Sequence, residues 1–213
     1  MVRIALIHAV RVAMDPVAEA FARLWPDAEV VNLLDDSLSV DRARDGEITP
    51  AMTDRFVVLA RHTRVTGADG ILFTCSAFGP CIETAARVVD IPVLKPNEAM
   101  FREGMAAGSR IGLLASFAPS LPPMEEEFRT LAGDVQLVSA CAPDAMTALA
   151  AGDGQEHDRQ LADVAVTLSH CDTIMLAQFS TARARAAVAA VTGLPVLTSP
   201  DSAVAAMKAR LSA

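Results

Sequence analysis

An internal repeat is the feature that most constrains the fold of this chain. The segment GADGILFTCSAFGPCIETAARVVDIPVL, which begins at Gly67, aligns without a gap with HCDTIMLAQFSTARARAAVAAVTGLPVL, which begins at His170, an offset of 103 residues. The apolar run RIALI at 3–7 is echoed by RIGLL at 110–114. An ungapped register of this length indicates two copies of one structural unit.

Each copy alternates short apolar runs with helical patterns. Most of the runs are apolar at successive positions, which is typical of parallel strands covered by helices on both faces. The expected strands are 3–8, 28–34, 70–75, 92–94, 110–115, 135–139, 173–177 and 195–198. We therefore predict an α/β fold of two pseudo-symmetric Rossmann-like halves, each a four-stranded parallel sheet flanked by helices.

The repeat also predicts the domain boundaries. We place the first half at 1–97 and the second at 98–200, with a C-terminal helix at 201–213 packing back on the first half. Ligands gather at the carboxyl ends of strands in such sheets, so we expect an active site in the cleft between the halves. The segment LLDDSLSVDRARDGEIT at 33–49 has no clear pattern and is predicted to be a long loop.

Composition and charge argue against several classes of function. The formal net charge is −8 without a basic cluster, which disfavours binding to nucleic acid. No apolar run reaches the roughly 18 residues of a membrane span, and the start reads as a strand, not as a signal peptide. The four cysteines are not clustered as metal ligands, and without an export signal we expect reduced thiols in a cytoplasmic setting. No nucleotide-binding glycine motif occurs in the required context.

The stretch FTCSAFGP ends one of the expected strands and places Cys75 just before a helix. The helix dipole and nearby backbone N–H groups would stabilise its thiolate, which makes Cys75 a candidate acid/base. The alternative is a buried structural cysteine. In the register of the repeat, Gln178 takes the place of Cys75 in the second half, and its amide cannot titrate.

Other polar residues follow the expected strands. His8 ends the first strand, where it would orient a substrate, transfer a proton, or simply be hydrogen-bonded. Ser116 lies at the related place in the second half and would donate to a carboxylate or cap the next helix. The other three histidines, His62, His157 and His170, fall on or beside expected helices and are predicted to be solvated.

The segments FTCSAFGP, MLAQFSTARA and PVLTSPDSAVAAMKARL together resemble the aspartate/glutamate/hydantoin racemase superfamily. The resemblance implies two facing halves, no metal and no organic cofactor, a small carboxylate substrate, and often a homodimer or larger homo-oligomer. Members commonly use one cysteine from each half on opposite faces of a carbon next to a carboxylate. By position Cys75 matches the first cysteine, while Gln178 stands where the second is expected. The implied substrate-binding residues are Ser76, Ala77, His8, Ser116, Gln178, Phe179 and Ser180.

The missing second cysteine leaves three readings open. The first is a cofactor-independent racemase or isomerase in which water or His8 replaces the second thiol. The second is a one-thiol decarboxylase or lyase of the arylmalonate decarboxylase type, in which Cys75 protonates one face of an enediolate. The third is a carboxylate-binding module without activity. Phe179 beside Gln178 suggests a less polar pocket wall or a core residue.

Overall fold

The computed structural model describes residues 1–212, in which eight strands form two four-stranded sheets. All strand pairs are parallel, and the strand orders are β2-β1-β3-β4 and β6-β5-β7-β8. The first sheet contains β1 (Arg3–His8), β2 (Glu29–Leu34), β3 (Gly70–Phe73) and β4 (Val93–Leu94). The second contains β5 (Arg110–Ala115), β6 (Gln136–Cys141), β7 (Thr173–Leu176) and β8 (Val196–Thr198). The predicted fold class is confirmed, and each expected strand lies within two residues of its observed bounds.

Ten α-helices connect and cover these strands within residues 1–212. They are α1 (Met14–Leu24), α2 (Ser37–Asp45), α3 (Pro50–Val65), α4 (Gly79–Ala86), α5 (Glu98–Ala107), α6 (Leu121–Leu131), α7 (Asp144–Ala150), α8 (Gly154–Ala165), α9 (Arg185–Thr192) and α10 (Ser199–Ser212). The chain divides into two compact units, of which one holds residues 1–96 and the end of the chain from Ala203, and the other holds residues 97–202. The boundary near the C-terminus therefore falls inside α10.

The two units repeat the same contacts at the start of their central strands. The backbone N–H of Arg3 donates to Oδ2 of Asp69 at 2.8 Å, and the N–H of Arg110 donates to Oδ2 of Asp172 at 2.9 Å. In return the backbone N–H of each aspartate donates to the carbonyl of its arginine, at 2.8 Å in both units. The two halves that the sequence repeat aligns therefore also make the same hydrogen bonds at equivalent residues.

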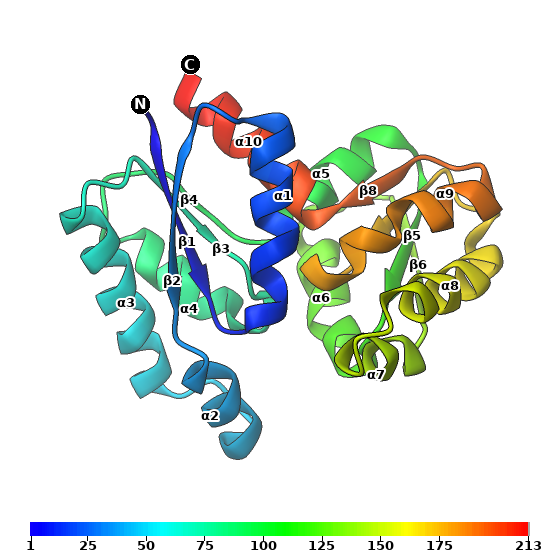
Figure 1. Ribbon diagram of the computed structural model, residues 1–213, viewed down its shortest axis with the longest axis horizontal. Helices are drawn as coiled ribbons and strands as arrows, with labels where there is room; N and C mark the ends of the chain where they lie inside the picture. Colours follow the sequence, from blue (N-terminus) through cyan, green and yellow to red (C-terminus); the bar gives the residue numbers. More distant parts are fainter. Residues whose placement is uncertain (213) are drawn as a thin grey trace. The chain divides into compact units, whose positions relative to one another are not determined.

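In the first unit, helices pack on both faces of the sheet. Buried side chains of α3 and α4 form one core with the facing residues of β1 and β3, and Phe56 stacks on Phe73 with ring centroids 5.2 Å apart. On the opposite face a Cβ at Gly70 would lie only 2.8 Å from the sulfur of Met207, so α10 packs closely against β3. The ribbon shows α3 and α4 on one side of this sheet and α1 on the other (Figure 1).

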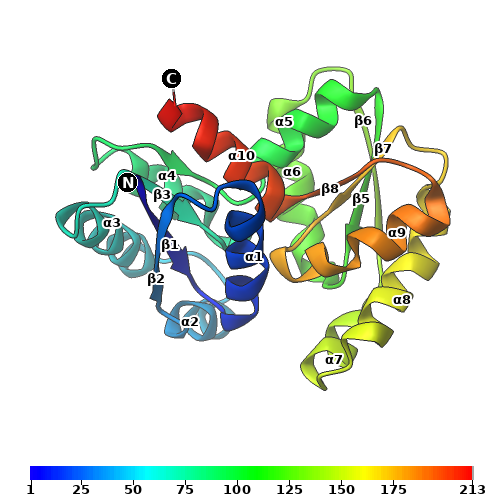
Figure 2. The ribbon, with the colours of Figure 1, turned by 45° about the horizontal axis from the view of Figure 1, so that its top comes forward.

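The second unit has the same layered arrangement. Residues of α8 and α9 form one core with Leu114, Ile174 and Leu176, while residues of α5 and α6 form another on the opposite face of the sheet. Phe101 of α5 and Phe128 of α6 meet edge to face at 5.5 Å. Figure 2 shows α8 and α9 on one side of the β5–β8 sheet, with α5 and α6 on the other.

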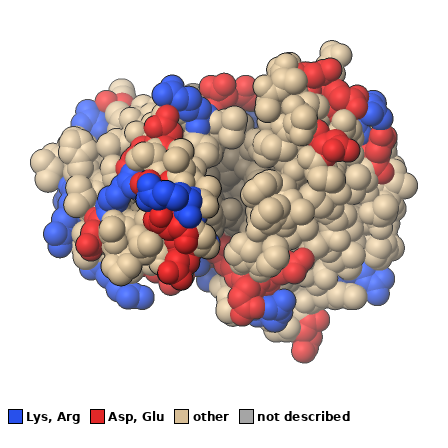
Figure 3. All heavy atoms as spheres, turned by 90° about the horizontal axis from the view of Figure 1, so that it is seen from below, with Lys and Arg blue, Asp and Glu red and all other residues tan. Residues whose placement is uncertain are grey.

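The expectation of a loop at 33–49 is wrong, because the segment contains α2. Its apolar pattern is weak, and Leu38 is its buried residue. The helix is held by charges that a hydrophobic pattern does not record: Arg55 of α3 reaches Asp35 at 2.5 Å and Asp41 at 2.6 Å. Gly46 ends the helix with a φ of 72°, a left-handed conformation that favours glycine. Ion pairs of opposite charge recur among the described residues, and Figure 3 shows basic and acidic side chains beside one another on the face that it draws.

Candidate active site

Cys75 lies just beyond the carboxyl end of a fully buried strand. All four residues of β3 are buried, and the chain leaves the sheet through Thr74 and Cys75. A single 3₁₀ turn follows at Ser76–Phe78, and α4 then begins at Gly79 with Pro80 in its first turn. Cys75 and Ser76 are half-buried and Ala77 is exposed. The strand, turn and helix start expected around the thiol are present.

The electrostatic environment of Cys75 differs from the sequence-based expectation. Burial raises the pKa of the thiol above its ordinary value, because a thiolate is poorly solvated among apolar side chains. The backbone N–H of Ala77 acts in the opposite direction and lowers the pKa, but it is the smaller of the two effects. The expected stabilisation of the thiolate is thus outweighed, and the pKa of Cys75 is raised overall.

Aromatic packing fixes the turn that carries the thiol. Phe78 at the end of the turn is buried against Phe56 of α3, with ring centroids 5.0 Å apart. Aromatic pairs of this kind contribute roughly 0.5–1.5 kcal/mol beyond their buried area. Cys81 in the first turn of α4 is fully buried, and its sulfur lies 3.4 Å from the hydroxyl of Thr53. Cys81 therefore packs in the core, while Cys75 remains partly accessible.

His8 is the centre of a hydrogen-bonded chain at the end of β1. Its side chain is fully buried, with Nδ1 2.8 Å from Oγ1 of Thr74 and Nε2 2.9 Å from Oδ1 of Asn32. Burial lowers the pKa of the imidazole, and the Asn32 contact raises it by less. A neutral ring that donates from Nε2 to Asn32 and accepts at Nδ1 from the Thr74 hydroxyl satisfies this geometry. Direct proton transfer from His8 to a substrate would require one of these bonds to break.

In the second unit, Gln178 uses its carboxamide to hold the loop after β5. Its Oε1 accepts the backbone N–H of Ser116 at 3.1 Å, and its Nε2 donates to Oγ of Ser120 at 2.6 Å. Its own backbone N–H donates to the hydroxyl of Thr181 as part of a capping box at the start of the 3₁₀ segment Phe179–Ala184. Gln178 thus occupies the position equivalent to Cys75 and forms structural hydrogen bonds there.

The remaining candidates of the second unit are mostly inaccessible. Ser116, Phe179 and Ser180 are all buried, with exposed fractions of 5% or less. The hydroxyl of Ser116 lies 3.5 Å from Oε1 of Gln178 and does not cap the following helix. In this structure, Phe179 is a core residue.

The structure brings the candidates into two groups, one in each unit. Cys75, Ser76 and Ala77 follow β3, and His8 ends the neighbouring strand β1. Ser116 and Gln178 follow the equivalent strands of the second unit. Sequence reasoning missed Thr74, Asn32 and Ser120, whose roles depend on contacts across the sheet or along a loop. The parallel register of β1 and β3, in which Ile7 lies beside Phe73, places Thr74 next to His8. Neither this register nor the contact of Ser120 has a local signal in the sequence.

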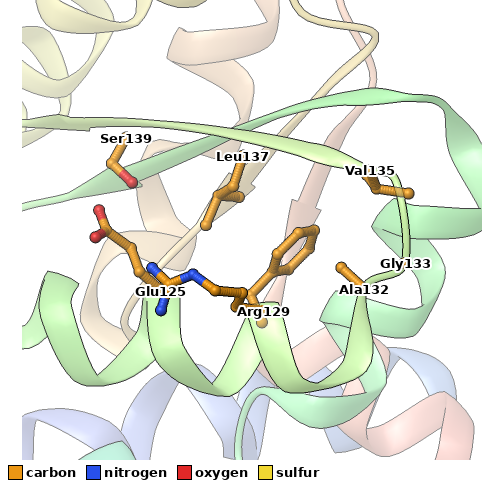
Figure 4. Close-up of a pocket in the computed structure, with 8 residues that line it drawn as sticks. Glu125, Arg129, Ala132, Gly133, Val135, Leu137 and Ser139 are labelled. Carbon is orange, nitrogen blue, oxygen red and sulfur yellow. The ribbon is translucent and has the colours of Figure 1, made fainter.

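Two further features lie outside these groups. His157 was expected to be solvated, but it is fully buried in α8 with Nδ1 2.7 Å from Oδ1 of Asp158, because it lies on the helix face that covers the sheet. His62 and His170 are exposed as expected. A cavity of about 270 Å³ opens between α6 and β6, and Figure 4 shows Glu125 and Arg129 facing Leu137 and Ser139. This cavity lies toward the start of β6, away from the strand ends that carry the candidate residues.

Within residues 1–212 no group of three or more His, Cys, Asp or Glu side chains is arranged to hold a metal ion. Over the same residues, no helix has the length and apolar character needed to cross a membrane. All four cysteines are free thiols.

Solved structures share this architecture. Allantoin racemase from Klebsiella pneumoniae superposes with a TM-score of 0.75 at 16% identity, covering 100% of this chain and 88% of its own. Glutamate racemase from Thermus thermophilus, in complex with beta-chloro-D-alanine, gives a TM-score of 0.72 at 20% identity and covers 99% and 80%. Unliganded arylmalonate decarboxylase gives 0.62 at 17% identity and covers 98% and 92%. At these identities the likeness shows the fold.

Sequence comparison identifies the family. No curated protein matches the chain significantly. The family profile described as Asp/Glu/Hydantoin racemase, however, matches residues 13–207, which is most of the chain and includes both halves of the repeat. The chain belongs to the Asp/Glu/hydantoin racemase family.

Proposed function

We propose that this protein is a cofactor-independent racemase or isomerase that acts at a carbon next to the carboxylate of a small acid, with Cys75 as its acid/base. Membership of the racemase family supports the reaction type. The observation that carries the assignment to Cys75 is its position: it is a half-buried thiol at the carboxyl end of a central parallel strand, beside a turn in which Ala77 is exposed. Ligands bind at such strand ends in α/β sheets.

The chemistry requires a group that moves a proton to and from carbon. In the forward direction a Cys75 thiolate takes the α-proton from one face, and the electron pair of the C–H bond passes into the carboxylate as an enediolate. Water on the opposite face then protonates the carbon, and the Cys75 S–H gives its proton to the hydroxide that remains, which restores the thiolate. The hydroxyl of Ser76 and backbone N–H groups of the same turn are proposed to hold the carboxylate. Because burial raises the Cys75 pKa, the resting thiol is an acid, and substrate binding must assist its ionisation before it acts as a base.

One observation favours a second candidate function, namely that the side-chain amide of Gln178 is already hydrogen-bonded within the protein. The position that would supply a second thiol carries an amide whose oxygen and nitrogen already bind Ser116 and Ser120. A one-thiol decarboxylase needs no second acid/base. The C–C bond to one carboxylate breaks, CO2 leaves, the electron pair forms an enediolate, and the Cys75 S–H delivers its proton to carbon. Water then reprotonates the thiolate, and one enantiomer results.

The two reactions and a simple binding role are separated by one experiment in D2O. Aspartate, glutamate, hydantoins and aryl-substituted malonates are incubated with the protein, and α-deuterium, optical purity and CO2 release are followed by NMR and chiral chromatography. Deuterium uptake with loss of optical purity supports the racemase or isomerase. A single deuterated enantiomer with CO2 release supports the decarboxylase. If a carboxylate binds without turnover, and binds Cys75→Ala as tightly as the wild type, both proposed reactions are refuted and the protein is a binding module.

The remaining expectations stand as parts of this proposal. We propose that the protein works in the cytoplasm and that it forms a homodimer or larger homo-oligomer. Light scattering of the purified protein tests the last of these directly. A monomeric mass at micromolar concentration would contradict it without affecting the role of Cys75.

A further inference from the structure

The hydrogen bonds of His8 to Asn32 and Thr74, called here the His8 network, end directly before Cys75. His8 is fully buried and Thr74 is 5% exposed, whereas Asn32 is exposed on β2, at the edge of the sheet. The network therefore joins the carboxyl ends of three neighbouring strands of the first unit. Buried polar groups are costly unless they are paired, and a fully paired network holds its members in one arrangement.

The second unit has the same backbone at this place without the network. Each member has an equivalent there, given by the strand pairings: Ala115 for His8, Ala177 for Thr74 and Ser139 for Asn32. Both alanines are fully buried. The backbone N–H of Ala177 donates to the carbonyl of Leu114 at 2.9 Å, and that of Thr74 makes the equivalent bond to Ile7 at 3.1 Å. The fold of the strand ends therefore does not require the polar side chains.

The network is present in the unit that carries the thiol, and the geometry of Cys75 explains why. Cys75 is extended, with φ −121° and ψ 118°, so its side chain and that of Thr74 point to opposite faces. Thr74 is bound by His8 on one face, while Cys75 packs against the apolar core on the other. Holding Thr74 therefore sets the direction of the next side chain. The equivalent Gln178 is held by its own amide, whereas a thiol forms only weak hydrogen bonds.

We infer that the three members of the His8 network are positioning residues, which hold the Cys75 thiol in the orientation that acid/base chemistry requires. This inference rests on the proposed function of Cys75. A neutral His8 donates from Nε2 to Asn32 and accepts the Thr74 hydroxyl at Nδ1, so the amide sets the tautomer and the tautomer sets the hydroxyl. Proton transfer needs the acid/base within hydrogen-bond reach of its substrate, which a thiol that swings freely does not maintain.

The test measures the alkylation of Cys75 by iodoacetamide against pH, with peptide mass spectrometry to separate the four free cysteines. Thr74→Val keeps the shape of the side chain and removes the hydroxyl that binds His8. Because burial raises the pKa of Cys75, a thiol that is released toward solvent ionises at lower pH. We expect alkylation at neutral pH to be at least about threefold faster in Thr74→Val, with its midpoint shifted toward that of free cysteine. Thr74→Ser keeps the hydroxyl and should restore the wild-type profile.

Two further variants separate positioning from general destabilisation. Thr63→Val is the matched control, because Thr63 is a fully buried threonine of the same unit whose hydroxyl donates to a backbone carbonyl of α3 at 2.8 Å. It should leave the alkylation of Cys75 unchanged. Asn32→Ser alters an exposed residue to the type that the second unit has at Ser139, and it should accelerate alkylation in the same direction as Thr74→Val. NMR of the imidazole nitrogens should show the Nε2–H tautomer of His8 in the wild type.

The other outcomes would overturn the inference. Unchanged alkylation of Cys75 in folded Thr74→Val and Asn32→Ser would refute positioning by the network and leave the proposed function standing. An equal acceleration in Thr63→Val would do the same, because the loss of any buried hydroxyl would then suffice. A wild-type His8 in the Nδ1–H tautomer would exclude the coupling to Thr74. Retention of α-hydrogen exchange by Cys75→Ser, in contrast, would refute the proposed function and with it the purpose of the network, even if alkylation behaves as expected.

Discussion

Replacing Gln178 by Met tests whether its amide is a structural clamp. Met has nearly the same length but can neither accept from Ser116 nor donate to Ser120. The Ser116 N–H is buried, so leaving it without an acceptor costs about 1–3 kcal/mol. The Ser120 hydroxyl is half-buried and can bind water, so its loss costs about 0.5–1.5 kcal/mol. The expected destabilisation is about 1.5–4.5 kcal/mol.

Two measurements test the destabilisation expected for Gln178→Met. At about 2–4 °C per kcal/mol for a chain of this size, the midpoint of thermal unfolding followed by circular dichroism should fall by roughly 3–18 °C. Native-state hydrogen exchange should show the Ser116 amide exchanging faster in Gln178→Met. Gln178→Glu is the matched control, because a carboxylate oxygen still accepts from Ser116 and only the donor is lost. If the Ser116 amide is equally protected in the wild type and in Gln178→Met, the clamp does not exist.

Three further predictions concern separate parts of the molecule. Because burial raises the pKa of Cys75, its alkylation by iodoacetamide should reach half-maximal rate at a higher pH than that of free cysteine, as measured by peptide mass spectrometry. A midpoint below that of free cysteine would contradict this. Burial lowers the pKa of His8 in the folded protein, so on acidification the unfolded chain is protonated at a higher pH than the folded one. The free energy of unfolding therefore falls as pH drops below about 6.5. Urea unfolding of His8→Leu should therefore depend less on pH between 7 and 5, and an unchanged dependence would exclude His8 as its source. A Cβ at Gly108 would lie 2.3 Å from Cβ of Asp172, so Gly108→Ala should destabilise by about 1–3 kcal/mol in the same assay, and a neutral result would refute the close contact.

The strands and the duplication could be predicted because their signals are local. Buried parallel strands are short apolar runs, and the repeat preserves the Asp69 and Asp172 contacts at the same register in both halves. The helix α2 could not be predicted in this way. Its stability depends on Arg55, which lies 14 and 20 residues away from the two aspartates it binds, Asp41 and Asp35.

The candidate site was only partly predictable for the same reason. The place of Cys75 at a strand end follows from the pattern around it, but the direction of its pKa shift depends on its burial against the core of the first unit. The role of Gln178 depends on Ser116 and Ser120, which are 62 and 58 residues distant in sequence. The repeat register identified the position of Gln178, and only the folded chain identifies its partners.

The most direct test of the central claim is α-hydrogen exchange by cysteine variants. Wild type, Cys75→Ser and Cys141→Ser are compared in D2O on whichever carboxylic acid the wild type turns over, with deuterium at the α-carbon measured by NMR. Cys141 is the control because it is also a half-buried thiol with a pKa raised by burial, but it lies at the end of β6. We predict that Cys75→Ser loses at least about a hundredfold in exchange rate, within the contribution of general acid–base catalysis. Cys141→Ser should retain the wild-type rate. Full exchange by a folded Cys75→Ser protein would contradict the assignment of Cys75 as the acid/base.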